Sequence, residues 1–196
     1  MKKIVIATKN KGKIREMENA FQGMAVKLVP LSEFGALPDA VENAETFEGN
    51  ARIKAAFYME KTGCACLADD SGLEVQALDG APGVYSARFA GYHADDAANN
   101  AKLLSELERV GQTASAAAYR CALVFVDTDG SELLTTGRCE GTIRRQPQGK
   151  GGFGYDPYFY VGAHSIAELS LEEKDKISHR GQALHRMAEK LRVYLG

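Results

Sequence analysis

The chain has 196 residues, of which 45% are hydrophobic and 26% charged, values typical of an ordinary globular protein with one sizeable core. Its 24 basic and 26 acidic residues give a net charge of −2, which argues against binding of polymeric nucleic acid or a membrane surface through general positive charge. No apolar run approaches a secretory core or the ~20 residues of a membrane span, so we expect a cytoplasmic protein. The four cysteines form no C-x-x-C pair, and we expect buried free thiols.

Strands and helices alternate along the first half of the sequence. The hydrophobic pattern predicts, in chain order, a strand over 3–7, a helix over 12–21, a strand over 26–29, a loop with one short turn over 31–45, a helix over 46–62 and a strand over 65–68. Thr46 is the expected N-cap of the second helix, which closes near Gly63.

The second half adds a long hairpin to this alternation. It contains a structured loop over 79–91, a helix over 95–110, two strands over 115–126 and 132–140, a glycine-rich loop over 147–159 and a last helix over 180–195. The Asp-Gly pair between the two strands is a strong hairpin signal. The pattern therefore predicts one α/β domain over 1–196, possessing a mixed sheet.

A polar turn joins the first strand to the first helix, in the segment TKNKGK at 8–13. The Gly12-Lys13 pair is not part of a P-loop, because that motif needs glycine at position 7 and a hydroxyl at 14, where the chain has Ala7 and Ile14. A helix N-terminus with three nearby lysines still favours an anion. The alternative is a solvated basic turn.

Two adjacent carboxylates, Asp69 and Asp70, stand at the end of an apolar run. Neighbouring side chains on a strand point to opposite faces, so one can reach a ligand while the other caps a turn. Mg²⁺ needs few protein oxygens, and the distant acids that could complete a site are Glu42, Glu45 and Glu48. A pair of turn-capping aspartates is the alternative.

The segment 149–154 matches G-x-G-x-x-G as a string, but an Asp-Pro pair follows it where a dinucleotide-binding motif needs a helix. Its glycines would allow a ligand to approach the backbone. The aromatics Phe153, Tyr155 and Tyr158 look exposed and could stack on a purine or plug the core beneath the loop.

His179 and Arg180 are expected at the start of the last helix, after Ser178 as its cap. Cations there oppose the helix dipole, which suggests that an anion or a carbonyl oxygen lies against them. A solvated face is the alternative.

Six motifs, in this order along the chain, closely resemble those of the Ham1/RdgB-like family of inosine triphosphate pyrophosphatases. They are T-x-N-x-x-K at 8–13, T-F-x-x-N-A-x-x-K-A at 46–55, A-D-D-S-G-L at 68–73, G-A-P-G-V-Y-S-A-R at 80–88, G-G-F-G-Y-D-P-x-F at 151–159 and S-H-R-G-x-A at 178–183. The resemblance covers essentially the whole chain.

The resemblance implies an elongated, two-lobed α/β fold around a long twisted mixed β-sheet, with the active site in the cleft between the lobes and a homodimer as the assembly. It also implies Mg²⁺-dependent hydrolysis of purine nucleoside triphosphates such as ITP, dITP and XTP to the monophosphate and pyrophosphate. Such an enzyme removes deaminated purines from the nucleotide pool.

Carried over residue by residue, the resemblance makes Asp70 the general base and a metal ligand together with Glu42. The residues expected to line the triphosphate are Thr8, Asn10, Lys13 and Lys174, and Ser71 is expected on the substrate beside Asp70. Phe153 is expected to stack on the base, and Asp156, His179 and Arg180 are expected to read its edge. Further residues expected to bind substrate are Lys9, Lys11, Gly12, Gly154 and Tyr155. Near the metal this chain departs from the family pattern, with Val41 and Gly49 where acids are common, which leaves the choice among the three glutamates open.

Two further hypotheses compete with this one. The chain could be a purine-nucleotide binding module that does not turn over, or a related pyrophosphatase that prefers other altered bases.

Overall fold

The computed structural model describes residues 1–91 and 95–196, which form two compact units. Unit 1 comprises Met1–Asp70, Cys121–Gly137 and Arg180–Gly196, and unit 2 comprises Ser71–Arg120 and Arg138–His179. The three longest strands each contribute residues to both units.

Seven strands form a mixed sheet, in the order β2-β1-β3-β4-β5-β6-β7. They are β1 (Lys2–Ile6), β2 (Val26–Pro30), β3 (Ala65–Val75), β4 (Ala114–Val126), β5 (Glu132–Arg144), β6 (Phe159–Val161) and β7 (His164–Ser165). Strand β1 pairs in parallel with β2 and β3, whereas β6 pairs antiparallel with β5 and β7. The predicted α/β class with a mixed sheet is confirmed.

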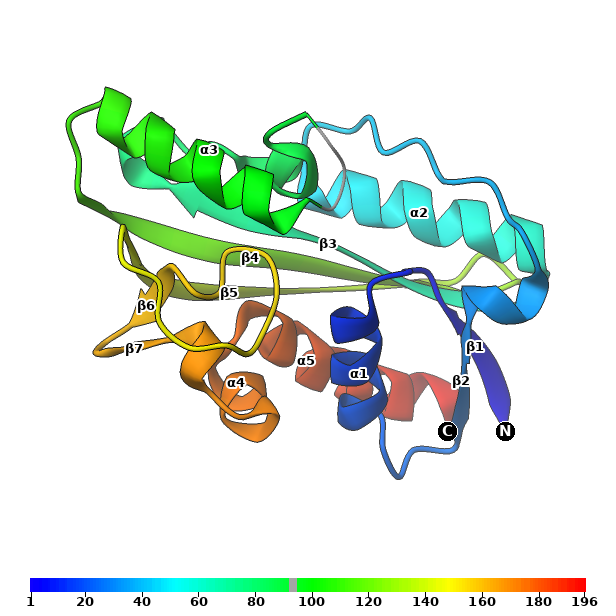
Figure 1. Ribbon diagram of the computed structural model, residues 1–196. Helices are drawn as coiled ribbons and strands as arrows, with labels where there is room; N and C mark the ends of the chain where they lie inside the picture. The colour runs from blue at the N-terminus through cyan, green and yellow to red at the C-terminus, as the bar shows by residue number, and fades with distance from the viewer. Residues whose placement is uncertain (92–94) are drawn as a thin grey trace. The chain divides into compact units, whose positions relative to one another are not determined.

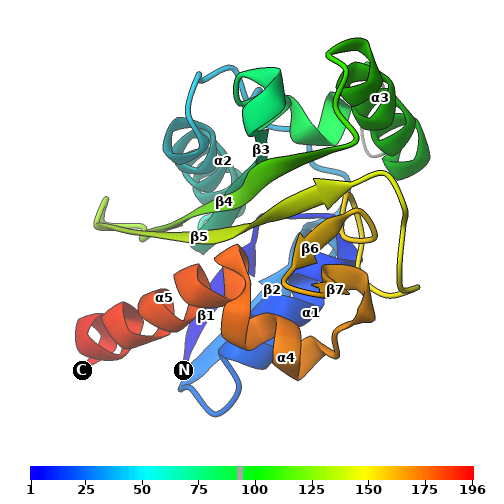
Figure 2. The same cartoon turned by 90° about the vertical axis from the view of Figure 1, so that its left-hand side faces the viewer.

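Helices cover both faces of the strands of unit 1. Helices α1 (Lys11–Ala20) and α5 (His179–Leu195) lie on one face, and α2 (Phe47–Thr62) lies on the other (Figures 1 and 2). Helices α1 and α5 form a core with β1, β3 and β4. Both helices contribute apolar residues at helical spacing, such as Met17 and Phe21 on α1 and Leu184 and Met187 on α5. These stripes position the helix ends that carry the charged residues described below.

Unit 2 is built around a second apolar core. Leu103 and Leu107 of α3 (Asp96–Arg109) pack with Leu73 of β3, Ile143 of β5 and Phe159 of β6. A short helix, α4 (Leu171–Ile177), follows β7 and leads to α5 (Figure 2).

Most elements begin and end within two residues of their predicted positions, but β3, β5, β6, β7 and α4 differ. Strand β5 ends at Arg144, four residues beyond its predicted end at Glu140. Strand β3 does not end at Ala68: it continues through both aspartates to Val75. Strands β6 and β7 and helix α4 occupy segments where no element was predicted. They are three, two and seven residues long, too short to produce a periodic hydrophobic pattern.

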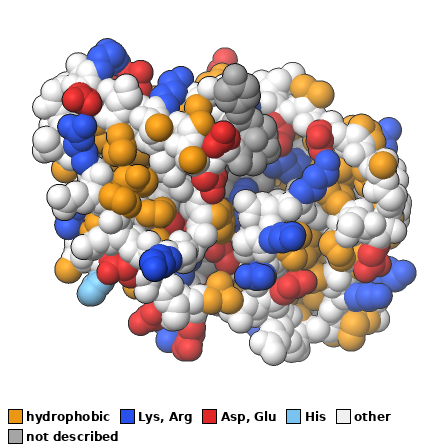
Figure 3. Space-filling view, in the orientation of Figure 1, with side chains coloured by type: hydrophobic (Ala, Val, Ile, Leu, Met, Phe, Trp, Pro, Cys, Tyr) orange, Lys and Arg blue, Asp and Glu red, His pale blue; other side chains and the backbone are white. Residues whose placement is uncertain are grey.

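The surface and the cysteines agree with the composition. On the face in Figure 3, Lys and Arg side chains are interspersed with those of Asp and Glu. All four cysteines are free, three of them buried and Cys64 half-buried. In the parts of the chain that the structure describes, no helix has both the length and the apolar character needed to cross a membrane.

Candidate functional site

A capped turn connects β1 to α1 in unit 1. The side-chain oxygen of Asn10 accepts hydrogen bonds from the backbone N–H groups of Gly12 (2.8 Å) and Lys13 (3.1 Å). Thr8 Oγ1 in turn accepts one from the Asn10 N–H (3.2 Å). The turn is thus ordered by its own side chains, and it presents a helix N-terminus without an acidic residue in its first turn.

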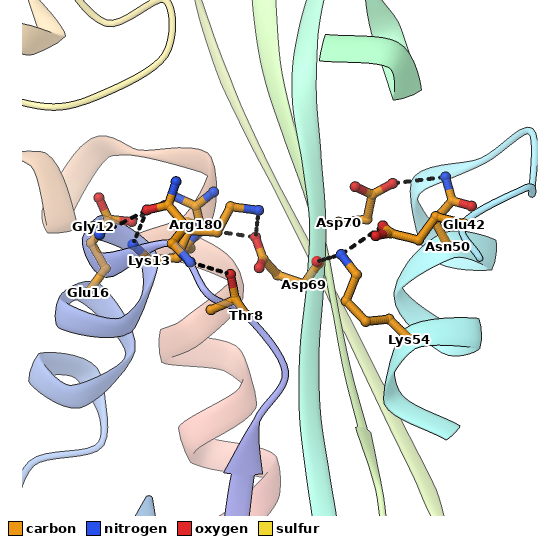
Figure 4. A network of polar contacts seen from close by, with 11 residues as sticks. Thr8, Gly12, Lys13, Glu16, Glu42, Asn50, Lys54, Asp69, Asp70 and Arg180 are labelled. Carbon is orange, nitrogen blue, oxygen red and sulfur yellow. Dashed lines mark hydrogen bonds and ion pairs between the residues drawn. The ribbon is translucent and has the colours of Figure 1, made fainter. Parts of the chain in front are cut away.

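Asp69 lies at the centre of a buried ion-pair cluster on one side of β3 (Figure 4). Its Oδ2 atom is 2.9 Å from Lys13 Nζ of α1 and 3.1 Å from Arg180 Nε of α5. The Arg180 guanidinium also contacts Glu16 Oε2 at 2.6 Å. Asp69 therefore anchors the first turns of two helices to the strand.

Asp70 points to the other side of β3, toward α2 (Figure 4). Its Oδ2 atom accepts a hydrogen bond of 3.1 Å from Asn50 Nδ2. On the same side, Lys54 Nζ lies 2.7 Å from Glu42 Oε2 and donates to the Asp69 carbonyl oxygen at 3.1 Å. Asn50 and Lys54 are four residues apart and therefore share one face of α2.

The two aspartates have opposite electrostatic environments. Burial alone would raise the pKa of Asp69, but the charges of Lys13, Arg180 and Lys54 outweigh it and hold this pKa well below its usual range. Burial raises the pKa of Asp70, and the neighbouring charge of Glu42 adds to this, against the opposing effects of Lys54 and Lys13. Asp69 is thus a fixed anion, while Asp70 is the better proton acceptor, and such a divergence is typical of catalytic carboxylate pairs.

Glu42 and Asp70 offer carboxylate oxygens of the kind that Mg²⁺ prefers. In residues 1–91 and 95–196, no three His, Cys, Asp or Glu side chains are grouped so that they could hold a metal ion by themselves. Two carboxylates nevertheless fit Mg²⁺, because this ion commonly takes its remaining ligands from water and substrate phosphates. Among the three candidate glutamates, Glu42 contacts Lys54, and its charge raises the pKa of Asp70.

Unit 2 contains a second polar cluster, centred on the buried side chain of Asp156. Its carboxylate accepts hydrogen bonds from Tyr119 Oη (3.1 Å), Lys174 Nζ (2.9 Å) and the Phe153 N–H (3.0 Å). The Tyr119 ring also stacks on the imidazole of His179, with 4.6 Å between ring centroids and 13° between the planes. Asp156 therefore holds Tyr119 and Lys174 directly, and Tyr119 in turn contacts His179.

Phe153 is half-buried on the glycine-rich loop. The Lys174 ammonium lies over its ring, 4.5 Å from the centroid, so both residues belong to the Asp156 cluster. A Cβ atom on Gly152 would overlap the Asp156 carboxylate, and Gly154 has a φ of +63°, in the left-handed region. The loop thus needs glycine on both sides of Phe153.

The sequence-predicted substrate residues fall into two groups. Unit 1 contains Thr8, Lys9, Asn10, Lys11, Gly12, Lys13, Glu42, Asp70 and Arg180, and unit 2 contains Ser71, Phe153, Gly154, Tyr155, Asp156, Lys174 and His179. Lys11 is exposed, Lys9 pairs with exposed Asp39, and Ser71 is half-buried on β3.

Two predicted residues have unexpected surroundings. The anion expected beside Arg180 is provided by the protein's own Glu16 and Asp69, in unit 1 rather than in the Asp156 cluster. Tyr155 is buried rather than exposed, because its hydroxyl donates to the Ser86 carbonyl oxygen at 2.7 Å, and burial raises its pKa.

Four residues of these clusters were not predicted from the sequence: Glu16, Asn50, Lys54 and Tyr119. Asn50 and Lys54 stand in the motif at 46–55, where their spacing of four residues on a predicted helix could have paired them. Glu16 and Tyr119 had no such signal, because their partners are distant in the sequence: 164 residues separate Glu16 from Arg180 and 37 separate Tyr119 from Asp156.

Comparisons with known proteins agree with this architecture. The model of the Ham1 family matches residues 4–190. A dITP/XTP pyrophosphatase of Desulforamulus reducens is 49% identical over 98% of both chains, and one of Geobacter sulfurreducens is 48% identical over 94% of both. Among solved structures, a HAM1 protein from Coxiella burnetii aligns with a TM-score of 0.88 and 42% identity, covering 97% of this chain and 98% of that one.

Proposed function

Because the chain belongs to the Ham1 family, we propose that it is a nucleoside-triphosphate pyrophosphatase that converts dITP, ITP and XTP to the monophosphate and pyrophosphate. The observation that best supports this function is the contrast between Asp69 and Asp70 in unit 1. A binding protein needs cations for phosphates, but it has no need of a carboxylate with a raised pKa beside them.

We assign the triphosphate to the turn between β1 and α1. The backbone N–H groups of this helix start and the lysine-rich sequence favour an anion. Lys13 is fixed in direction by Asp69, which in turn is held by Arg180. Arg180 thereby acts as a positioning residue, in addition to the role at the base that the family resemblance implies.

Glu42 and Asp70 would hold Mg²⁺, with Lys54 fixing Glu42 in place. The ion, when bound, neutralises the charge of the phosphate oxygens. Asp70, held by Asn50, orients the attacking water and takes its proton while the bond between the α- and β-phosphates breaks.

The Asp156 cluster of unit 2 is proposed to bind the base. Phe153 stacks on the purine, and Asp156 fixes the cationic and aromatic residues around it. Donors on Lys174 and His179 would pair with the 6-oxo group of a deaminated purine and would oppose a 6-amino group, which carries its own donors. The contacts of Lys174 with Asp156 and Phe153 support a role at the base rather than at the triphosphate.

The family resemblance also supports two properties of the whole protein. We propose a homodimer, and we propose that the enzyme acts on the cytoplasmic nucleotide pool to remove deaminated purines before a polymerase incorporates them.

Pyrophosphate release tests the proposed function directly. Release is measured with ITP, dITP, XTP, ATP and GTP, with Mg²⁺ and with a chelator. We expect release from the first three in the presence of Mg²⁺ and a much lower kcat/KM for ATP and GTP. If no triphosphate releases pyrophosphate, the proposed activity is excluded and the alternative of a non-catalytic binding module is supported. If another altered nucleotide has a higher kcat/KM than ITP, the protein is a related pyrophosphatase with a different substrate preference.

Substitution of Asp70 by Asn separates chemistry from binding. We expect D70N to lower kcat by about 10²–10⁴-fold, the usual contribution of a general base, while the binding of ITP measured by calorimetry persists. D127N is the matched control, because Asp127 is a buried aspartate of the same unit that contacts Lys2 and Tyr194. Retention of more than a tenth of the kcat in D70N would exclude the proposed role.

A further inference from the structure

The backbone of Gly154, the residue after Phe153, is held by two side chains near the N-terminus of α3. The Gly154 N–H donates to Asp96 Oδ2 at 2.7 Å, and the Gly154 carbonyl oxygen accepts from Asn100 Nδ2 at 2.9 Å. Asn100 Nδ2 also donates to the backbone carbonyl oxygen of Asp96 at 2.8 Å, so the Asn100 side chain is itself held by the backbone of α3. The two residues are four positions apart on α3 and thus lie on the same helix face. We call Asp96 and Asn100 the α3 clamp.

Two other contacts of this loop involve buried side chains. The Phe153 N–H donates to Asp156, and the Tyr155 hydroxyl donates to the Ser86 carbonyl oxygen. Tyr155 and Asp156 are only 4% and 3% exposed, whereas Asp96 is exposed to solvent. Within the α3 clamp, Asp96 is thus a support of the loop that lies at the protein surface, whereas Asn100 is buried.

Gly154 cannot hold its conformation through side-chain packing. Its φ of +63° is accessible mainly to glycine, and a Cβ there would meet no other atom within 4 Å. Glycine also has the largest conformational freedom to lose when a loop becomes ordered. Two hydrogen bonds to the same residue restrict that freedom before any ligand arrives.

We propose that Asp96 and Asn100 are positioning residues that pre-order the Phe153 ring for stacking on the purine. The inference rests on the proposed function of Phe153. A ring that is already ordered loses little entropy when it stacks, so the α3 clamp increases affinity without touching the base. The α3 clamp affects the binding of substrate and not the chemical step. Its loss should therefore raise KM and leave kcat unchanged.

Kinetics of five variants test this role: D96A, D96N, D95A, F153A and the double variant D96A/F153A. We expect D96A to raise the KM for ITP about three- to tenfold with the same kcat, since a hydrogen bond to a charged group is lost. D96N should restore most of the affinity because it retains an oxygen acceptor. D95A is the matched control: Asp95 is the N-cap of α3, and its carboxylate accepts from Ala98 rather than from the loop.

The double variant shows whether Asp96 acts through Phe153. We expect D96A to have almost no effect on KM in the F153A background, because the stacking that the clamp supports is already lost. Equal effects of D96A in both backgrounds would overturn the proposal. So would a rise in KM in D95A as large as that in D96A, because the effect would then come from the helix itself.

A fluorescence measurement tests the α3 clamp independently of activity. The sequence contains no tryptophan, so F153W introduces a single reporter at the loop. In the absence of nucleotide, we expect acrylamide to quench this tryptophan more strongly in D96A/F153W than in F153W or D95A/F153W. Unchanged quenching in D96A/F153W would overturn the clamp. If F153A leaves the KM for ITP unchanged, the stacking role of Phe153 fails, but the quenching result still decides whether Asp96 orders the loop.

Discussion

Asp69 and Asp70 are chemically identical neighbours that the strand directs into different surroundings. Asp69 meets Lys13 and Arg180 on one side of β3, and Asp70 meets Asn50 on the other, with Lys54 and Glu42 close by. The alternation of side chains along a strand separates the two carboxylates without any change of residue type. One aspartate can therefore be structural and the other reactive.

Lys54 provides a direct test of this electrostatic difference. Its charge lowers the pKa of Asp70 and opposes burial and Glu42, which raise it. In K54M this opposing charge is lost, so the pKa of Asp70 should rise further. Because the ionised carboxylate is the active form, we expect the acidic limb of the pH profile of kcat/KM for ITP, at fixed Mg²⁺, to move to higher pH.

K54R is the matched control for this experiment, because arginine keeps the positive charge on a side chain of similar length. Its acidic limb should stay close to that of the wild type, even if kcat falls. An acidic limb at the same pH in K54M and the wild type would show that Lys54 does not influence the base.

Residue roles could be proposed from the sequence where motifs are local. Asp70, Glu42 and the turn at 8–13 stand in short motifs, and in the structure the charge of Glu42 raises the pKa of Asp70. The ion pair of Asp69 with Arg180 joins residues 111 positions apart, and no local pattern encodes such a contact. For this reason the protein's own carboxylates were not foreseen as the anions beside Arg180.

At the scale of elements, caps and periodicity made most boundaries predictable. Thr46 and Gly63 bound α2 as expected, and the hairpin turn follows Asp127 as its sequence indicates. Strand β3 was predicted too short because charged residues normally mark the end of a buried strand. Here the charge of Asp69 is balanced within the fold by cations from α1 and α5, so the strand can continue through it.

The cap of α1 allows helix stability to be separated from phosphate binding. N10S and N10D both keep a side chain that can cap the helix, so their free energies of unfolding should stay within about 0.5 kcal/mol of each other. The added negative charge of N10D lies at the proposed triphosphate site. We expect it to raise the KM for ITP about three- to tenfold relative to N10S, the equivalent of about 1 kcal/mol of repulsion.

Salt dependence identifies the origin of this effect. The ratio of the two KM values should decrease as the ionic strength rises, because screening weakens the repulsion. Equal KM values for N10S and N10D at low salt would mean that the triphosphate does not bind near this turn.

At the scale of the whole molecule, a polar contact in unit 1 joins both ends of the chain to the hairpin. Asp127, in the turn between β4 and β5, contacts Lys2 near the N-terminus and accepts a hydrogen bond of 2.8 Å from Tyr194 Oη near the C-terminus. The Lys2 ammonium also lies 5.6 Å from the centroid of the Tyr194 ring. The three segments are thereby held together by one carboxylate, at a position that the proposed chemistry does not use.

Stability as a function of pH tests this contact. Burial alone would raise the pKa of Asp127, but the hydrogen bonds from Lys2, Tyr194 and Thr128 outweigh it and lower the pKa. A lowered pKa means that the ionised group stabilises the fold above the ordinary aspartate range near pH 4, and that this stability is lost as the pH falls through the folded-state pKa. We expect D127N to lower the free energy of unfolding in urea by about 1–3 kcal/mol at pH 7, with the difference from the wild type decreasing below about pH 4.

D129N is the matched control, because Asp129 lies in the same turn but is exposed and accepts a hydrogen bond from Ser131 within that turn. If D127N and D129N unfold at the same urea concentration at pH 7, Asp127 does not hold the two ends of the chain to the hairpin.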